Sequence, residues 1–296
     1  MSDSFDHLAP ECRNEARLDT NDRVRAILTE RWISYPRANF ALQRLEDLLQ
    51  YPPRDRMPCL LLFGPTGMGK TKILKKFIRD HAPTFNTKTG ISGRPVVAIQ
   101  MPPDPDEKAL YLQLLHAVNA PTRYGHTVHH LRQIIGDLLS YTGTRMLVID
   151  EVHSLLASSY RQQRILLNTL RFLANELQLV LVCAGTADAK RAMLTDQQLA
   201  DRFEAVELPP WHNDNDFRRL LASFQALLPL RKKSDLSAPD IRQEILRRTE
   251  GITVRIVRLL EQVAVEAVRS GSEEITLDRF SLLDSQAPLL SMEADA

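Results

Sequence analysis

The stretch Leu60-Leu61-Leu62-Phe63-Gly64-Pro65-Thr66-Gly67-Met68-Gly69-Lys70-Thr71 joins an apolar run to a glycine-rich turn. This order, with the pattern GxxxxGK[ST], predicts a buried strand, a phosphate-binding loop and a helix that begins near Lys70. The glycines let the loop curl so that its backbone N–H groups point inward, and the helix adds the positive end of its dipole. The sequence therefore predicts a site where several donors converge on a phosphate.

The residue types of this loop favour ATP with Mg²⁺ as its ligand. Lys70 would reach the β and γ phosphates, and the hydroxyl of Thr71 would hold the metal ion. The predicted nucleotide contacts are Gly64, Pro65, Thr66, Gly67, Met68, Gly69, Lys70 and Thr71. The alternative interpretation is a glycine-rich turn beside a solvated lysine.

A second apolar run, residues 146–149, ends in two adjacent carboxylates, Asp150 and Glu151. At the carboxyl end of a strand, Asp150 would hold Mg²⁺ through water, and Glu151 would be the general base for the attacking water. This division of roles favours hydrolysis over phosphoryl transfer, because no feature marks a pocket for a second substrate. His153 follows two residues later, where it would orient Glu151, sense the nucleotide or cap the next helix.

The chain has 296 residues, of which 44% are apolar and 25% are charged. That length suits one α/β domain and a smaller satellite. The longest apolar runs are far shorter than the ~18 residues that a membrane-spanning helix needs, and the start MSDSFDHL is too polar for a signal peptide. We therefore expect a cytoplasmic protein with no membrane partner. Cys12, Cys59 and Cys183 lack metal-binding spacing, which indicates reduced packing residues.

The formal net charge of +1 does not by itself predict a nucleic-acid partner, since dedicated binders are often strongly basic. Two local clusters are basic. The helix after the phosphate loop carries Lys72, Lys75, Lys76 and Arg79, and residues 231–233 read Arg-Lys-Lys. Each cluster is either a solvated face or a binding site.

Apolar runs alternate with helical patterns through the middle of the chain, which predicts an α/β fold with a parallel sheet and helices on both faces. The expected strands are residues 59–63, 95–100, 145–149, 179–184 and 205–208. After Pro209-Pro210 the period becomes purely helical, over residues 214–227, 237–249, 253–270 and 277–283. Asn213 or Asp214 is the expected cap of the first of these helices, and Ser237 with Asp240 the expected capping box of the second.

Four segments are expected along the chain. They are an N-terminal arm and helix at residues 1–50, a nucleotide-binding α/β core at 51–210, a small helical lid at 211–285 and a flexible tail at 286–296.

This combination of a Walker A loop, a Walker B strand and a trailing helical lid resembles the AAA+ ATPases, which are P-loop NTPases. The resemblance implies roles for three more residues. Thr186, after the next strand, matches the polar sensor position, although an asparagine is often found there. Arg202, in Leu199-Ala200-Asp201-Arg202-Phe203, matches the arginine finger; the alternative is a surface arginine at a helix end. Arg255, in Gly251-Ile252-Thr253-Val254-Arg255, matches the sensor of the lid.

An arginine finger that reaches the γ-phosphate of a neighbouring subunit works in trans. The resemblance therefore implies that ATP lies at an interface between copies of this chain, in a ring or a helical filament. A lid arginine on the same phosphate would couple the lid to the nucleotide state.

Within the AAA+ proteins, the chain resembles the TniB and TnsC group of transposition regulators. The segments that carry this resemblance are Arg31-Trp32-Ile33-Ser34-Tyr35-Pro36-Arg37-Ala38, Pro53-Arg54-Asp55-Arg56-Met57-Pro58, Asp150-Glu151-Val152-His153 and Ala184-Gly185-Thr186. In such proteins Tyr35 or Ile33 would stack on the adenine; the alternative is a helix break that packs on the core. The loop sequence GPTGMGKT departs from the asparagine-containing form of TniB, but it keeps every phosphate-binding position.

The resemblance implies an ATP-dependent protein that assembles on double-stranded target DNA, works with a target-selection protein and recruits or activates a transposase, with ATP hydrolysis driving disassembly. The turn at residues 120–127 mixes a cation, an aromatic ring and hydroxyls, so Thr122, Arg123 and Tyr124 are candidate phosphate contacts. As a plain helix connector, this turn needs no such role.

Two other functions fit the same nucleotide site. One is a helicase loader or replication-initiation factor, which shares the core. The other is a nucleotide-gated scaffold that binds proteins and never DNA, which suits the near-zero net charge.

Overall fold

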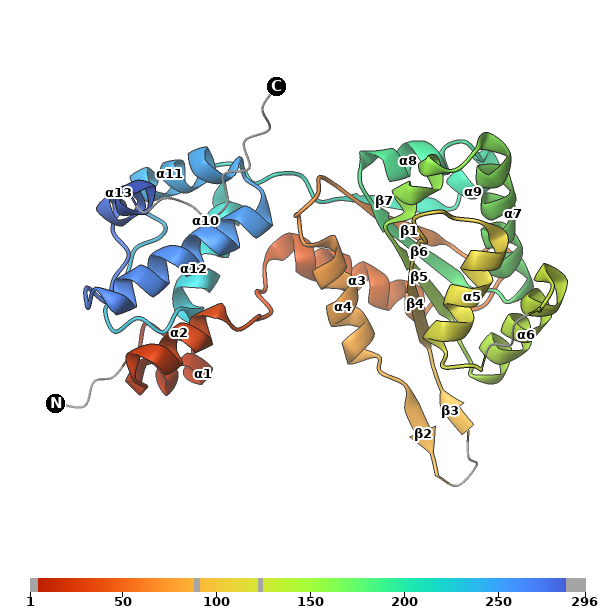
Figure 1. Ribbon diagram of the computed structural model, residues 1–296, viewed down its shortest axis with the longest axis horizontal. Helices are drawn as coiled ribbons and strands as arrows, with labels where there is room; N and C mark the ends of the chain where they lie inside the picture. The colour runs from red at the N-terminus through yellow and green to blue at the C-terminus, as the bar shows by residue number, and fades with distance from the viewer. Residues whose placement is uncertain (1–4, 88–90, 122–124, 286–296) are drawn as a thin grey trace. The chain divides into compact units, whose positions relative to one another are not determined.

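The computed structural model of the protein describes residues 5–87, 91–121 and 125–285 (Figure 1). The chain folds into two compact units. One contains residues 37–209, and the other combines residues 1–36 with residues 210–296. The contacts between residues thus group the first 36 residues with the C-terminal helical part. The sequence-based division into four segments instead treats residues 1–50 as a separate arm and helix.

The nucleotide-binding unit is built on a parallel sheet of five strands in the order β4-β5-β6-β1-β7. The strands are β1 (Cys59–Phe63), β4 (Val96–Gln100), β5 (Met146–Asp150), β6 (Val180–Gly185) and β7 (Phe203–Glu207). All five lie within two residues of the expected strands. The parallel register places the carboxyl ends of β5, β6 and β1 side by side, with Ile149 opposite Cys183 and Phe63 opposite Gly185.

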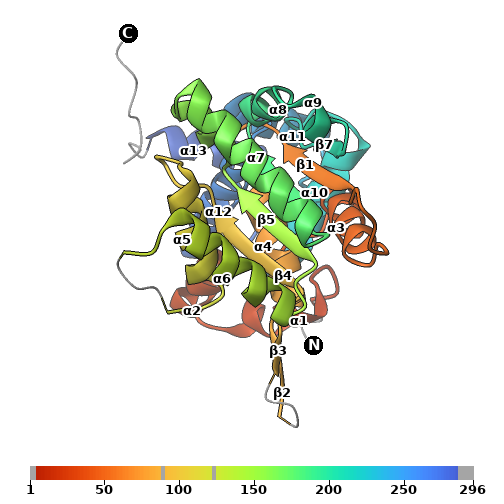
Figure 2. The same ribbon diagram turned by 90° about the vertical axis from the view of Figure 1, so that its right-hand side faces the viewer.

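Helices cover both faces of this sheet, which explains why the central strands are apolar throughout rather than alternating. The helices are α3 (Pro36–Leu49), α4 (Lys70–Asp80), α5 (Glu107–Ala117), α6 (Val128–Tyr141), α7 (Tyr160–Glu176), α8 (Ala187–Met193) and α9 (Gln197–Ala200), with the 3-10 turn η2 (Val152–Ala157). Figure 2 shows α5, α6 and α7 on one face, whereas α3 and α4 lie on the other in Figure 1. Alternate strand residues such as Leu61, Ile149 and Leu181 join the core beneath α5, α6 and α7.

A short antiparallel ribbon follows α4 and lies outside the main sheet (Figure 1). It pairs β2 (Thr84–Asn86) with β3 (Ile91–Gly93). The ribbon was not expected, because three-residue strands of mainly polar residues show no apolar run.

The second unit is helical. Its C-terminal part contains α10 (Asn215–Leu227), α11 (Pro239–Thr249), α12 (Thr253–Arg269) and α13 (Leu277–Ser285), as the sequence predicts. Its N-terminal part contains α1 (Pro10–Arg13), η1 (Glu15–Arg17) and α2 (Thr20–Leu28). The side chain of Asp214 caps α10 by accepting a hydrogen bond from the backbone N–H of Phe217.

One predicted cap is wrong. The cap position of α11 is Ala238, which makes no side-chain cap bond, and the following residue is Pro239. Proline has no N–H to be capped and already has a helical φ, so this helix begins with less need of a side-chain cap. The hydroxyl of Ser237 instead donates to the carboxylate of Asp235.

The N-terminal residues pack on the C-terminal helices of the same unit. Phe5, Leu8, Cys12 and Ala16 form a small core against which Leu227 of α10 packs. Helix α2 also contacts α12. Among the described residues, no helix combines the length and the apolar character that crossing a bilayer requires.

Candidate nucleotide site

The loop between β1 and α4 has the geometry of a phosphate cradle. A Cβ atom on Gly64 would lie 2.3 Å from the carbonyl oxygen of Leu208, so only glycine allows the loop to pass this close to the end of β7. Gly69 precedes α4 with φ 92°, a left-handed conformation that other residues adopt at a cost. The chain therefore turns within a few residues and presents the N-terminus of an eleven-residue helix at the sheet edge.

Lys70 is fixed inside this loop. Its side chain is buried, and its Nζ donates to the carbonyl oxygens of Gly64 and Pro65 at 2.9 and 2.8 Å. Burial lowers the pKa of Lys70, while the negative charges of Glu151 and Asp150 act in the opposite direction. The ammonium group thus lies at the centre of the loop, close to the two carboxylates that end β5.

Thr71 and Asp150 connect the loop to β5. The Thr71 hydroxyl donates to Oδ2 of Asp150 at 2.6 Å, and the backbone N–H of Glu151 donates to Oδ1 at 2.8 Å. Both carboxylate oxygens are therefore oriented. Because β6 separates β1 from β5 in the sheet, this contact spans one strand at the carboxyl edge.

The donors at this edge fit Mg²⁺ bound together with a nucleotide. Mg²⁺ keeps several waters and takes one or two protein oxygens together with phosphate oxygens, and a threonine hydroxyl beside a carboxylate supplies such a pair. Among the residues that the structure describes, no cluster of three or more His, Cys, Asp or Glu side chains forms a separate metal site. A metal ion at this edge would therefore depend on the nucleotide for the rest of its ligands.

Glu151 lies beside Asp150 but is directed by different contacts. Its backbone is left-handed, with φ 55°, and it is the residue immediately before η2. Its Oε2 lies 3.2 Å from Nδ1 of His153, and more than a third of its side chain is exposed. The structure thus leaves Glu151 accessible to solvent, as a general base requires.

Thr186 follows β6, between the strands that carry the loop and the two carboxylates. Its hydroxyl oxygen is buried, and it makes no hydrogen bond to any residue that the structure describes. A buried hydroxyl without a partner is uncommon in proteins. No described residue therefore satisfies this hydroxyl.

Arg202 lies at the opposite edge of the same sheet. Its carbonyl oxygen accepts from the N–H of Cys59, the first residue of β1, at 2.9 Å, whereas Gly64 follows the last residue of β1. Five strand residues at about 3.3 Å each separate the two edges by roughly 16 Å, a distance that an arginine side chain does not span. The Nη1 of Arg202 donates to Oδ1 of Asn175, at the end of α7, at 2.6 Å. No motif in the sequence indicates this contact with Asn175.

The remaining predicted nucleotide contacts belong to the helical unit. Arg255 lies in the first turn of α12 and forms an ion pair with Glu250. Tyr35 is buried, and its ring packs edge-on against Trp211, with ring centroids 5.2 Å apart. Ile33 is half-buried between α2 and α3. Their roles toward the nucleotide stay predictions.

The candidate DNA contacts Thr122, Arg123 and Tyr124 lie outside the described residues. In the sequence they lie between α5 and α6, and Thr127 caps α6 by accepting from the N–H of His130.

Comparison with known proteins gives one family and one fold. The sequence model of a family described as "Bacterial TniB protein" matches residues 23–213. No curated protein matches the chain. This family match covers the whole nucleotide-binding unit. It also includes residues 23–36 and 210–213 of the helical unit.

Several solved structures have a similar fold. The Aeropyrum pernix ORC2 protein, in ADPNP–ADP complexes, has a TM-score of 0.61 and 17% identity, over 88% of this chain and 71% of that one. The Aeropyrum pernix ORC1 protein in complex with DNA has a TM-score of 0.59 and 17% identity, over 89% and 69%. Drosophila ORC bound to DNA has a TM-score of 0.59 and 13% identity, over 95% and 68%. The similarity confirms the predicted P-loop AAA+ fold, with its parallel sheet and C-terminal helical part.

Proposed function

The chain belongs to the bacterial TniB family and is an AAA+ ATPase, and from this premise we propose that it regulates transposition as an ATP-dependent DNA-binding protein. The observation that carries the proposal is the family match, because it spans a stretch that contains the complete nucleotide set: Lys70, Thr71, Asp150 and Glu151. The proposed reaction is hydrolysis of ATP to ADP and phosphate with Mg²⁺ bound.

Each residue at the loop edge has a distinct task in this reaction. Lys70 places a positive charge where the β and γ phosphates meet the loop, and bound Mg²⁺ supplies further neutralisation of the phosphate charge. Thr71 and Asp150 hold the metal ion. Glu151 accepts a proton from the attacking water, while the buried hydroxyl of Thr186 bonds to the water or to the γ-phosphate.

The position of Arg202 supports a reaction that is completed by a second copy of the chain. Within one chain Arg202 lies at the edge of the sheet away from its own phosphate loop, so it would act on the ATP of a neighbour. ATP binding then favours assembly into a ring or helical filament, and hydrolysis releases the subunits. Arg255 and a stacking contact by Tyr35 or Ile33 would couple the helical unit to the nucleotide.

Double-stranded DNA is the proposed template for this assembly. ORC1 and Drosophila ORC, which share the fold, were solved with DNA. Because the net charge is only +1, the affinity for DNA would depend on local contacts. Thr122, Arg123 and Tyr124 are the proposed contacts. The assembled protein would recruit or activate a transposase, together with a target-selection protein, in the cytoplasm.

Fluorescence anisotropy of labelled duplex DNA tests this proposal. We expect sequence-tolerant binding with a non-hydrolysable ATP analogue and much weaker binding with ADP or without nucleotide, with a strong dependence on salt. Lys70→Ala should abolish the response to the analogue. Lys108→Ala, a change to an exposed lysine of α5 outside the two basic clusters, is the control and should keep it. Absence of DNA binding in every nucleotide state would refute the proposal and favour a protein-only scaffold.

A Glu151→Gln variant separates binding from turnover. It should bind ATP, assemble and persist on DNA, because the amide keeps the size of the side chain but does not accept a proton. Normal turnover by this variant would remove Glu151 from its assigned role.

A replication-initiation or helicase-loading function is the second candidate, because the ORC proteins are similar over most of this chain. Affinity capture on the ATP-bound, DNA-bound protein distinguishes the two. Recovery of a transposase supports the proposed function, whereas recovery of a replicative helicase supports the second candidate.

A further inference from the structure

We infer that His153 is a positioning residue for Glu151, the proposed general base. This inference rests on the proposed ATPase reaction and concerns the same site. The contact that motivates it joins Nδ1 of His153 to Oε2 of Glu151, which lie 3.2 Å apart.

The surroundings of His153 fix its ring rather than leaving it on the surface. His153 lies on η2, which is anchored in the core by the buried side chains of Val152 and Leu155. Its Nδ1 atom is buried and has no well-aligned hydrogen bond to any described residue, so the carboxylate of Glu151 is the partner within reach. The turn that carries His153 is thus anchored in the core, and Nδ1 lies beside the carboxylate of Glu151.

The neighbouring strand leaves room for this ring. A Cβ atom on Gly185, the last residue of β6, would lie 3.2 Å from His153 Nδ1 and 2.7 Å from the Cβ of Ala189. A larger residue at position 185 would therefore press against the imidazole. The glycine before Thr186 lets β6, η2 and α8 pack together around His153.

The imidazole can donate from Nδ1 only in the tautomer that carries its proton there. In this structure Nδ1 and Oε2 lie within 3.2 Å of each other, but no N–H is aligned with the carboxylate. The inference therefore rests on the proximity of the ring to the carboxylate and on the restricted space around it.

This arrangement follows a general rule for activated bases, in which a third group orients the base that acts on the nucleophile. A glutamate at the start of a turn, with more than a third of its side chain exposed, otherwise samples several rotamers. Restricting it to one rotamer raises the fraction of molecules in which the base faces the water. The effect should therefore fall on kcat and spare the affinity for ATP.

Steady-state ATPase measurements on three variants test the inference. His153→Ala should lower kcat by roughly tenfold to a hundredfold, which is the range for loss of an orienting partner. The KM for ATP and the analogue-dependent binding to DNA should stay within about twofold, because no phosphate contact is lost. Unchanged kcat in His153→Ala would overturn the inference.

Two conservative variants show whether the position of the donor matters. In His153→Asn the side-chain amide can donate from near the place of Nδ1, whereas in His153→Gln it donates from near the place of Nε2. We expect His153→Asn to recover much of the lost kcat and His153→Gln to recover little. Equal recovery by both variants would contradict a role for Nδ1, and His153→Asn also provides a test if the alanine variant folds poorly.

A double-mutant cycle shows whether His153 acts through Glu151. In a Glu151→Gln background, His153→Ala should change the remaining turnover by less than about twofold, since the residue that it orients is already inactive. Full additivity would refute the inference. If the unmodified protein binds ATP but does not hydrolyse it, the proposed ATPase function fails as well, whereas normal hydrolysis with no effect of His153→Ala removes only this inference.

Discussion

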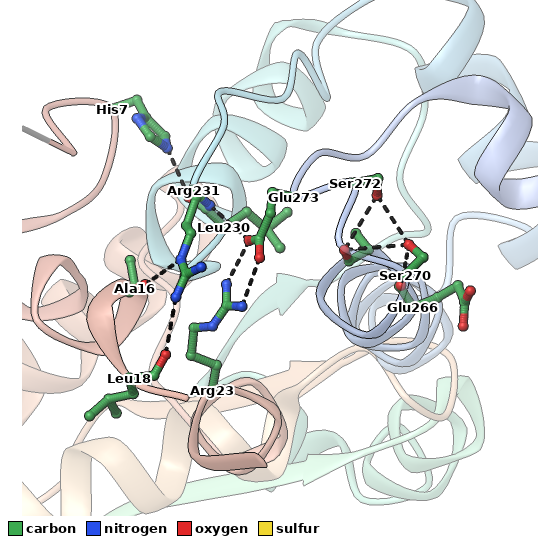
Figure 3. Close-up of polar contacts among 11 residues, drawn as sticks. His7, Ala16, Leu18, Arg23, Leu230, Arg231, Glu266, Ser270, Ser272 and Glu273 are labelled. Carbon is green, nitrogen blue, oxygen red and sulfur yellow. Dashed lines mark hydrogen bonds and ion pairs between the residues drawn. The ribbon is translucent and has the colours of Figure 1, made fainter. Parts of the chain in front are cut away.

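Arg23 and Glu273, which are 250 residues apart in the chain, form a two-bonded ion pair inside the helical unit (Figure 3). Nη1 of Arg23 donates to Oε2 of Glu273 at 2.6 Å, and Nη2 donates to Oε1 at 2.7 Å. The backbone N–H of Arg231 donates to the same carboxylate at 3.2 Å, and the side chain of Arg231 bonds to the carbonyl oxygens of Ala16 and Leu18. These contacts connect η1 and α2 to the segment before α11 and to the turn after α12.

Loss of Arg23 should destabilise the helical unit. The side chain of Arg23 is 2% exposed, so Arg23→Met leaves a buried carboxylate without its paired charge. The expected loss in free energy of unfolding is about 3 kcal/mol. Guanidinium denaturation followed by circular dichroism measures it. Arg25→Met, on the same helix but with 82% of the side chain exposed, is the control and should change the stability little. Similar midpoints for the two variants would show that the buried pair contributes little.

The same pair should make stability depend on pH in the acid range. Burial raises the pKa of Glu273, but the hydrogen bond from Arg23 and the bond from Arg231 N–H outweigh it, so the net pKa lies below its ordinary value of 4.5. A depressed folded-state pKa gives stability that is complete above the unfolded-state pKa and is lost as the pH falls through the folded-state value. We therefore expect the denaturation midpoint of the unmodified protein to fall below about pH 4.5 more steeply than that of Glu273→Gln. Parallel pH profiles would contradict this assignment.

The hydroxyl of Thr71 should affect the metal requirement more than nucleotide binding itself. Thr71→Ala removes the group that bonds to Asp150 and would hold Mg²⁺, but it leaves Lys70 and the loop backbone in place. We expect the Mg²⁺ concentration for half-maximal ATPase activity to rise about tenfold or more, as for loss of one good charge-assisted contact. Thr71→Ser keeps the hydroxyl and should behave as the unmodified protein. The assignment fails if Thr71→Ala has an unchanged Mg²⁺ dependence.

The sequence predicted the sheet well because its signals are local. Each central strand is a short apolar run, and the loop after β1 carries a motif in which every position has a physical reason. Parallel pairing then places Asp150, Thr186 and the loop at one edge of the sheet, so the composition of the candidate site followed from strand order. The ribbon of β2 and β3 was missed, because its short polar strands lack a periodic pattern.

Polar contacts between residues that are far apart in the chain could not be predicted from local sequence patterns. The helical spacing of Val24, Ile27 and Leu28 predicts an apolar buried face for α2, but Leu28 is 58% exposed while Arg23 is buried. A buried arginine is costly unless a carboxylate pairs with it. No residue close to Arg23 in the sequence indicates that Glu273 is this partner. The contacts between Arg202 and Asn175 and between His153 and Glu151 likewise depend on how turns and helix ends meet at the sheet edges.

Turnover should be restored by mixing two inactive variants, because Arg202 and Lys70 would serve different subunits at one ATP site. Arg202→Ala keeps the phosphate loop but lacks the arginine for its neighbour, whereas Lys70→Ala keeps the arginine but does not hold ATP. Each variant alone should hydrolyse ATP at least about a hundredfold more slowly than the unmodified protein, given the size of arginine-finger effects. In an equal mixture, interfaces that pair an intact loop with an intact arginine recover part of the activity. Steady-state ATPase assays on the mixture, at concentrations that support assembly on duplex DNA, measure this recovery. Arg79→Ala, a change to an exposed residue of α4, replaces Arg202→Ala in the control mixture and should show no gain beyond its own activity. If the mixture stays inactive although Lys70→Ala is incorporated into the assemblies that Arg202→Ala forms with ATP on duplex DNA, Arg202 does not act in trans.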